Sequence, residues 1–159
     1  MVRAWRLTKR RHSHAAFDGE GARVYGGRWN SVGTRIAYAS ESRAVALLEV
    51  LVHLGSSKVL PAYDFAGIEL PSSLIEVLDP GTLPPNWSDS PSPVEVQAIG
   101  DAWVSSGRSA VLAVPSTIIP EALNYLINPV HARFSELVVR SPEPFVFDRR
   151  LIGLIQRER

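Results

Sequence analysis

The stretch from residue 34 to residue 55 constrains the fold of this chain more than any other. Its first residues alternate, with Tyr38 on one face and small alanines on the other, which predicts a strand. The following residues, ALLEVLVH, are apolar on two adjacent stripes, so we expect a helix that begins after Ser40 or Ser42 and is closed by Gly55. A strand followed by a helix that is covered on two sides requires a layered domain.

Glu49 interrupts this otherwise apolar helix. It lies on the second stripe with Val45 and Val52, no Lys or Arg lies one turn away, and His53 is its only helical partner. Because an unpaired charge on an apolar surface costs free energy, we expect Glu49 to point into a cleft where it takes part in chemistry. The alternative is a carboxylate at the rim, hydrogen-bonded to His53 or to a backbone amide.

The rest of the chain is predicted to contain more strands than helices. The expected strands cover residues 3–8, 59–65, 67–70, 74–78, 109–114, 137–139 and 144–147. The first alternates Ala4 and Arg6 with Trp5 and Leu7, a pattern that suits an edge strand with one wet face. Because the strands come in runs and do not alternate regularly with helices, the pattern indicates an α+β fold.

Two further helical segments are expected. Residues 92–95, SPVE, combine a capping-box spacing with proline at the first helical position, and they predict a helix to about Ser106 that is closed by Gly107. A short helical turn is expected at 121–127. The Pro/Ser-rich segment 79–93 is interpreted as a loop within the domain and not as a linker between domains.

Length and charge narrow the class of protein. A chain of 159 residues is predicted to form one domain, residues 1–159, with a frayed tail at 156–159. Its 17 Lys and Arg against 16 Asp and Glu argue against broad nucleic-acid binding. The absence of cysteine excludes disulfides and thiol chemistry, and no apolar run could span a bilayer. With no signal-like N-terminus, a cytoplasmic protein is expected.

Three further side chains are candidates for ligand binding. Arg28 follows two glycines, which would let a ligand approach the backbone while the guanidinium binds a phosphate or carboxylate; the alternative is a turn arginine stacked on Trp29. Tyr38 can stack on a planar ring or simply pack in its strand. Ser116 lies just beyond an apolar strand, where its hydroxyl can bind a ligand or cap the following turn.

Several common sites are not supported by the sequence. The run GEGARVYGG lacks the G-x-G-x-x-G spacing, no P-loop is present, and VPSTI is not a G-x-S-x-G elbow. The four histidines lack metal-ligand spacing, so no metal site is expected. Asn124 and Asn128, in NYLINP, either line a cleft or cap turns.

Three segments together resemble the RES-domain family, the toxin half of bacterial toxin–antitoxin pairs: FDGEGARVYGGRWNSVGTRIAYASES, ALLEVLVH and VPSTIIPEALNYLINPVH. The family takes its name from an arginine, a glutamate and a serine. The matching positions are Arg28 in GGRWN, Glu49 in ALLEVLVH and Ser116 in VPSTIIP, and Tyr38 in IAYAS matches as well. The resemblance runs from about residue 17 to residue 148.

This resemblance implies a fold similar to ADP-ribosyltransferases of the diphtheria-toxin type, with two small, mostly antiparallel sheets and flanking helices around an NAD cleft. It implies that the protein degrades NAD by hydrolysis or phosphorolysis, or transfers ADP-ribose to a protein. The implied partner is an antitoxin with an Xre-like helix-turn-helix domain that occludes the active site. A homodimer within a larger toxin–antitoxin complex is left open.

The resemblance also implies roles for the matching residues. Cleavage of the bond between nicotinamide and ribose develops positive charge on the sugar, which Glu49 would stabilise. Arg28 would hold the pyrophosphate, Tyr38 would pack against nicotinamide or its ribose, and Ser116 would bind the nicotinamide side with Asn128 as a neighbour. No metal or covalent nucleophile is demanded. Whether water, phosphate or a protein side chain attacks the sugar stays open, as does a module that binds NAD or ADP-ribose without cleaving it.

Overall fold

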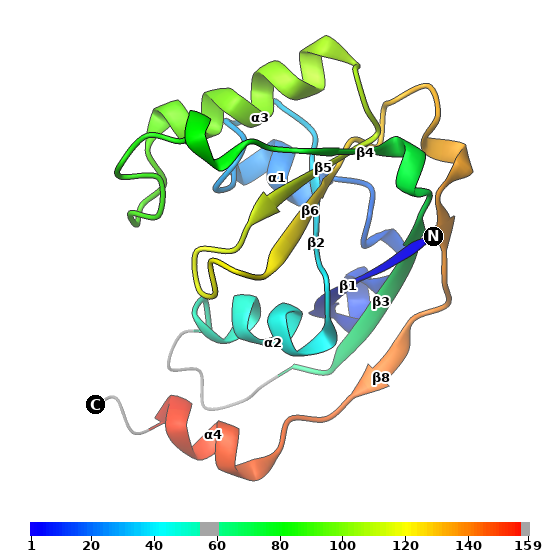
Figure 1. The fold of residues 1–159 in the computed structure, drawn as a ribbon. Coiled ribbons are helices and arrows are strands. Elements are labelled where there is room, and N and C mark those ends of the chain that lie inside the picture. Colours follow the sequence, from blue (N-terminus) through cyan, green and yellow to red (C-terminus); the bar gives the residue numbers. More distant parts are fainter. Residues whose placement is uncertain (55–60, 157–159) are drawn as a thin grey trace.

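The computed structural model describes residues 1–54 and 61–156. Within that part of the chain, eight strands form a curled sheet in the order β4-β5-β6-β2-β1-β3-β7, with β8 also pairing with β3 (Figure 1). The strands are β1 Val2–Lys9, β2 Ala37–Ser40, β3 Tyr63–Leu70, β4 Ile75–Val77, β5 Val111–Pro115, β6 Leu123–Ile127, β7 Val138–Val139 and β8 Glu143–Phe145. The α-helices are α1 Glu20–Tyr25, α2 Arg43–Leu51, α3 Val94–Ser106 and α4 Arg149–Gln156, and short 3-10 helices cover Arg10–Ala15, Ser72–Leu74, Pro80–Thr82 and Phe134–Glu136.

The prediction of a mixed fold with mostly antiparallel strands is confirmed. Within the described residues, the paired strands are antiparallel except β4 with β5. The two expected small sheets are joined, because Trp5 of β1 pairs with Ser40 of β2. Among the described residues, that pair is the one register contact between the two halves of the sheet, so the halves diverge on either side of it.

Helices α2 and α3 cover the same face of the sheet, at some distance from each other. Ala46 of α2 packs with Leu7 of β1, whereas Trp103 of α3 packs with Leu126 of β6. Leu7 and Leu126 lie on the same face of the sheet. Directly paired residues of neighbouring strands point to the same side, and so do residues two apart along one strand, and the pairs between β1, β2 and β6 link Leu7 to Leu126 in this way. The strands β2, β5 and β6 therefore run between the two helices, as Figure 1 shows.

The opposite, inner face of the curled sheet is filled mainly by small and branched side chains. Ala39, Ala66 and Ala113 are buried there with larger residues such as Ile68 and Phe17. Small side chains on this face let the segments that cover it pack closely against the strands.

The segment 121–127, expected as a helical turn, is a central strand instead. Residues of β6 pair with β2 on one side and with β5 on the other. Tyr125, Leu126 and Ile127 are all buried, so side chains from both faces of this strand enter the core. A short apolar run does not distinguish a buried strand from a helical turn, and the pairing partners decided the outcome.

The start of α3 also differs from its expected capping box. Proline 93 is the N-cap and makes no side-chain cap bond, whereas the Ser92 hydroxyl donates to the backbone oxygen of Arg28 at 2.5 Å. The predicted end of the helix is confirmed, because Gly107 adopts a left-handed conformation with φ of 59°. Ser92 therefore ties the loop before α3 to the glycine-rich loop, and this tie helps to position Arg28.

Helix α2 begins as predicted, with the Ser42 hydroxyl accepting a hydrogen bond from the Val45 amide at 3.2 Å. Its expected closing residue, Gly55, lies outside the described residues. None of the described helices is long and apolar enough to cross a membrane.

Candidate active site

Glu49 reaches from α2 to the sheet. Its Oε1 accepts hydrogen bonds from Asn124 Nδ2 at 2.7 Å and from Ser116 Oγ at 3.0 Å. The predicted alternative partner, His53, is exposed at the end of the helix. The cluster unites three separate elements, because Ser116 follows β5 and Asn124 lies on β6. The carboxylate is thus held by neutral donors at one oxygen, and no hydrogen bond to Oε2 is present among the described residues.

Ser116 is completely buried, with none of its surface exposed. Its oxygen accepts hydrogen bonds from the backbone amides of Ile118 and Ile119 at 3.1 and 3.3 Å. These amides occupy the lone pairs of the oxygen, so the hydroxyl hydrogen is directed to Glu49. Sequence reasoning placed Ser116 on the nicotinamide side of a ligand, but this geometry favours a role in holding the glutamate.

Tyr38 is anchored by its hydroxyl. The oxygen accepts a hydrogen bond from the Trp29 amide at 3.0 Å and donates to Asn30 Oδ1 at 2.6 Å. A side chain at Gly27 would lie 2.7 Å from the Tyr38 hydroxyl, so a glycine is needed for the loop to approach this closely. Burial raises the pKa of Tyr38 well above its usual range, and the phenol is therefore neutral.

Arg28 lies on the loop that Tyr38 anchors. Its Nη1 donates to the backbone oxygens of Trp87 and Asp89 at 3.2 and 2.9 Å. The Gln97 side chain of α3 donates to the neighbouring Gly27 oxygen at 3.0 Å. The loop and the guanidinium are thus held against the α3 side of the molecule, while Nε and Nη2 make no hydrogen bond within the described residues.

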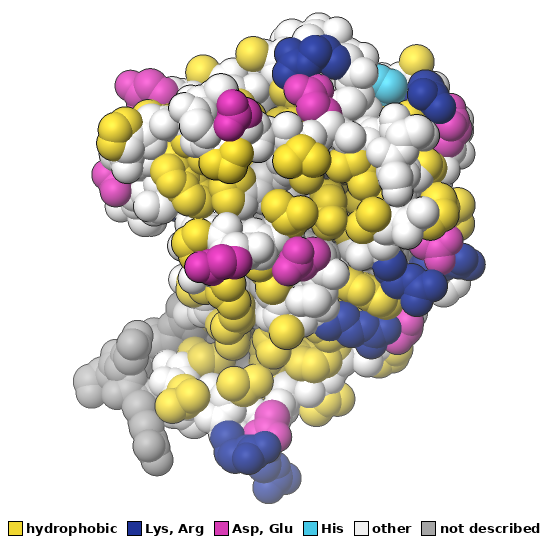
Figure 2. Space-filling model, in the orientation of Figure 1, with side chains coloured by type: hydrophobic (Ala, Val, Ile, Leu, Met, Phe, Trp, Pro, Cys, Tyr) yellow, Lys and Arg dark blue, Asp and Glu magenta, His cyan; other side chains and the backbone are white. Residues whose placement is uncertain are grey.

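A continuous path of contacts connects Arg28 to Glu49. Trp29, next to Arg28, binds the Tyr38 hydroxyl, and Tyr38 lies two residues before Ser40 on the same strand face. The Ser40 hydroxyl in turn donates to Asn124 Oδ1 at 2.7 Å, and Asn124 binds Glu49. The predicted residues Arg28, Tyr38, Glu49 and Ser116 therefore belong to one connected region of the α2–α3 face. In space-filling view, the surface is hollowed between the part that carries α3 and the part that carries α2, and hydrophobic side chains gather beside this hollow (Figure 2).

Arg6 lies in an environment that the sequence did not indicate. It lies on β1, which was expected at the edge of the sheet but is flanked by β2 and β3. Its side chain is partly buried on the face that carries Ala66, opposite to Tyr38, and desolvation lowers the pKa of the guanidinium, while Asp18 and Tyr38 act in the opposite direction. Among the described residues it makes neither a hydrogen bond nor a salt bridge. A period-two strand pattern carries no sign of this environment, because it does not tell which strands will flank the residue.

Asn128 is not brought to this cluster. It is four residues from Asn124 along the direction of β6, about 13 Å at the rise of a strand. Its side-chain oxygen accepts a hydrogen bond from the Val130 amide at 3.1 Å, and the residue is 2 % exposed. Its observed role is that of a turn cap.

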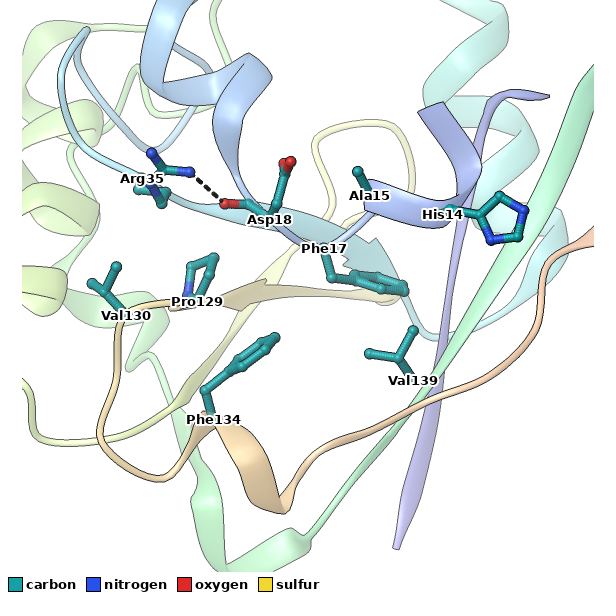
Figure 3. Close-up of a pocket in the computed structure, with 9 residues that line it drawn as sticks. All are labelled: His14, Ala15, Phe17, Asp18, Arg35, Pro129, Val130, Phe134 and Val139. Carbon is teal, nitrogen blue, oxygen red and sulfur yellow. Dashed lines mark hydrogen bonds between the residues drawn. The ribbon is translucent and has the colours of Figure 1, made fainter. Parts of the chain in front are cut away.

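A pocket on another part of the surface lies away from this cluster. It has a volume of about 520 Å³ and is lined by His14, Ala15, Phe17, Asp18, Arg35, Pro129, Val130, Phe134 and Val139. Figure 3 shows Phe17, Phe134 and Val139 pointing into this space, with Arg35 bonded to the Asp18 backbone oxygen. None of the predicted site residues lines it. The described residues also contain no group of three or more His, Asp or Glu side chains that could hold a metal ion.

Comparisons with known proteins agree with the sequence resemblance. The model of the RES domain family matches residues 3–148. A protein of Sphingobium sp. (strain YBL2) described as "Prs ADP-ribosylating toxin" is 39% identical over 153 residues, covering 93% of this chain and 95% of the relative. A "Toxin Res" of Yersinia enterocolitica is 38% identical over 148 residues, covering 92% and 97% of the two chains.

Among solved structures, a chain of the Mycobacterium tuberculosis MbcT–MbcA toxin–antitoxin complex superimposes with a TM-score of 0.76. The match covers 98% of this chain and 88% of the other at 19% identity, so it supports the fold alone.

Proposed function

This chain belongs to the RES domain family, and on that premise we propose that it is the toxin of a bacterial toxin–antitoxin pair that consumes NAD by cleaving the bond between nicotinamide and ribose. The observation that carries the proposal is Glu49, a carboxylate set on an otherwise apolar helix and held at one oxygen by two neutral donors. No cation is bonded to it among the described side chains. A negative charge kept in this way is available to oppose a positive charge on a bound molecule.

Glu49 fits the electronic demand of this reaction. As the glycosidic bond breaks, its electron pair leaves with nicotinamide, which becomes neutral, and positive charge develops on the ribose. Oε2 of Glu49 accepts a hydrogen bond from a ribose hydroxyl and opposes that charge. The interaction strengthens as the charge grows, so it stabilises the transition state more than bound NAD.

Arg28 supplies the attraction for the pyrophosphate of NAD. Arg28 has one terminal nitrogen held by backbone oxygens, which leaves Nε and Nη2 for a phosphate. Tyr38, neutral and anchored by its hydroxyl, offers its ring as a surface for nicotinamide or its ribose.

Two outcomes for the ribose are compatible with this site. Attack by water or phosphate would make the protein an NAD glycohydrolase or phosphorylase, and attack by a protein side chain would make it an ADP-ribosyltransferase. The second outcome is favoured by the name of the Sphingobium relative, an ADP-ribosylating toxin. The proposed substrate places the activity in the cytoplasm, and the proposed partner is an antitoxin of the Xre-like helix-turn-helix type.

The test compares the wild-type protein with Glu49→Gln in an assay of nicotinamide release from NAD. The introduced amide can place its oxygen at the position of Oε1, where Ser116 and Asn124 donate to it, so the fold is retained while the charge is lost. We expect turnover to fall by about 10²- to 10³-fold, the usual effect of removing a group that stabilises transition-state charge.

The matched control is Glu95→Gln, the same change on the exposed first turn of α3. It should retain wild-type turnover. Nicotinamide release by Glu49→Gln at the wild-type rate would exclude Glu49 from the reaction, and binding of NAD without release by the wild-type protein would identify a binding module. Product analysis with and without phosphate, and with candidate protein acceptors, then assigns the attacking group.

A further inference from the structure

We propose that Asn124 and Ser40 are positioning residues that hold Glu49 in one orientation, so that Oε1 is committed to the protein and Oε2 faces the substrate. This inference rests on the proposed function of Glu49. It assigns a role to two side chains that carry no ionisable group.

The first observation is that two donors converge on a single oxygen. Asn124 Nδ2 and Ser116 Oγ lie 2.7 and 3.0 Å from Oε1 of Glu49. A glutamate side chain has three rotatable bonds, and a single hydrogen bond leaves several of its rotamers open. Two donors that come from different segments, the residue after β5 and a residue of β6, define the position of the carboxylate group more closely than either would alone.

The second observation is that the Asn124 amide is itself oriented. Ser40 Oγ lies 2.7 Å from Asn124 Oδ1, on the strand directly opposite in register. With its oxygen directed to Ser40, the amide can present only its NH₂ group to Glu49. The flipped amide would set its oxygen against a carboxylate oxygen, which is repulsive. The acceptor-only carboxylate thus selects the NH₂ end of Asn124, and the Ser40 hydroxyl holds the other end of the amide in place.

The third observation is burial. Ser40 is only 3 % exposed, whereas Asn124 and Glu49 are partly exposed. Water therefore does not readily replace the Ser40 hydroxyl, and the buried end of the hydrogen-bond network holds its more exposed members in place. The substrate-facing end of the chain Ser40–Asn124–Glu49 is the carboxylate.

The test measures kcat and KM for NAD in Asn124→Leu and Ser40→Ala. Loss of Asn124 frees the carboxylate to move by about 1 Å, and such displacement lowers kcat by about 10²-fold. Ser40→Ala removes a neutral hydrogen bond and should lower kcat by about 3- to 10-fold. KM should change by less than about twofold in both variants, because Arg28, which we assign to the pyrophosphate, is untouched.

The matched control is Ser42→Ala, which removes a partly buried hydroxyl two residues from Ser40. The Ser42 hydroxyl caps α2 and is not hydrogen-bonded to Glu49. It should lower the melting temperature and leave kcat unchanged. A general effect of loosened structure would instead lower kcat in step with the melting temperature in all three variants, and that correlation would overturn the positioning role.

A second readout separates this inference from the proposed function. Crystal structures of Asn124→Leu and the wild-type protein should show the Glu49 carboxylate displaced from Ser116 or in several orientations in the variant. If Glu49 keeps its place in Asn124→Leu, or if that variant retains the wild-type kcat while Glu49→Gln is inactive, the inference is wrong. If the wild-type protein releases no nicotinamide, the proposed function fails, and the comparison of the Glu49 orientations alone decides the positioning role.

Discussion

The contact between Gly100 and Trp29 gives the sharpest test of how the site is supported. Gly100 lies in the middle of α3, and a Cβ atom built there would be 1.7 Å from the backbone oxygen of Trp29. Nonbonded heavy atoms approach to about 3.5 Å, so Gly100→Ala forces the helix and the loop apart by about 1.5 Å. The obstructing atom belongs to the backbone and cannot rotate away.

The expected magnitude follows from two opposing effects. Alanine favours a helix over glycine by about 1 kcal/mol, whereas overpacking a core costs about 1–3 kcal/mol and more when backbone must shift. We expect a net loss of about 2 kcal/mol in the free energy of unfolding, which lowers the melting temperature of a domain of this size by about 4–8 °C. Because the Trp29 amide binds the Tyr38 hydroxyl, nicotinamide release should fall as well.

The assay is thermal unfolding followed by circular dichroism, with urea unfolding at constant temperature as a check on the free energy. Gly21→Ala in α1 is the matched control, since nothing lies within 4 Å of a Cβ at that position. It should leave stability unchanged or raise it by up to about 1 kcal/mol. A Gly100→Ala protein as stable as Gly21→Ala would show that α3 does not pack against the Trp29 loop as described.

Three other outcomes are expected. Arg28→Ala should weaken NAD binding by about 10- to 100-fold in calorimetry, because charge-assisted hydrogen bonds are lost. The control Arg133→Ala, which removes an exposed arginine paired with a neighbouring acid, should bind NAD as tightly as the wild-type protein. Equal NAD affinities of the two variants would contradict the assignment of Arg28. Burial raises the pKa of Tyr38, so the difference in phenolate absorbance between the wild-type protein and Tyr38→Phe should appear only above a pH of about 10. Above that pH the folded protein retains a proton that the unfolded chain loses, so the free energy of unfolding should fall as the pH rises. The hydrogen bond from Arg10 lowers the pKa of Asp64, so this pair stabilises the fold above a pH of about 4, and its contribution is lost as the pH falls through the lowered pKa of Asp64. If Asp64→Asn shows the same dependence of unfolding on acid pH as the wild-type protein, this expectation is wrong.

Local pattern was sufficient for several elements of the fold. The N-cap at Ser42, the end of α3 at Gly107 and the strand that carries Tyr38 depend on neighbouring residues, and all three were predictable. The site was predictable in part for the same reason. Glu49 is conspicuous because a carboxylate interrupts an apolar helix, and that contrast is visible within one turn of the chain.

The sequence alone determined which residues have the chemistry for the proposed reaction, but only the tertiary structure decided how they are combined. Ser116 and Asn124 bind Glu49 across separations of 67 and 75 residues, and Arg6 is partly buried on an inner strand because β2 and β3 flank β1. Hydrogen bonds and burial between distant segments depend on strand order and register, which no local periodicity specifies. For this reason the segment 121–127 was mistaken for a helical turn, and the orientation of the Glu49 carboxylate could be seen only in the folded chain.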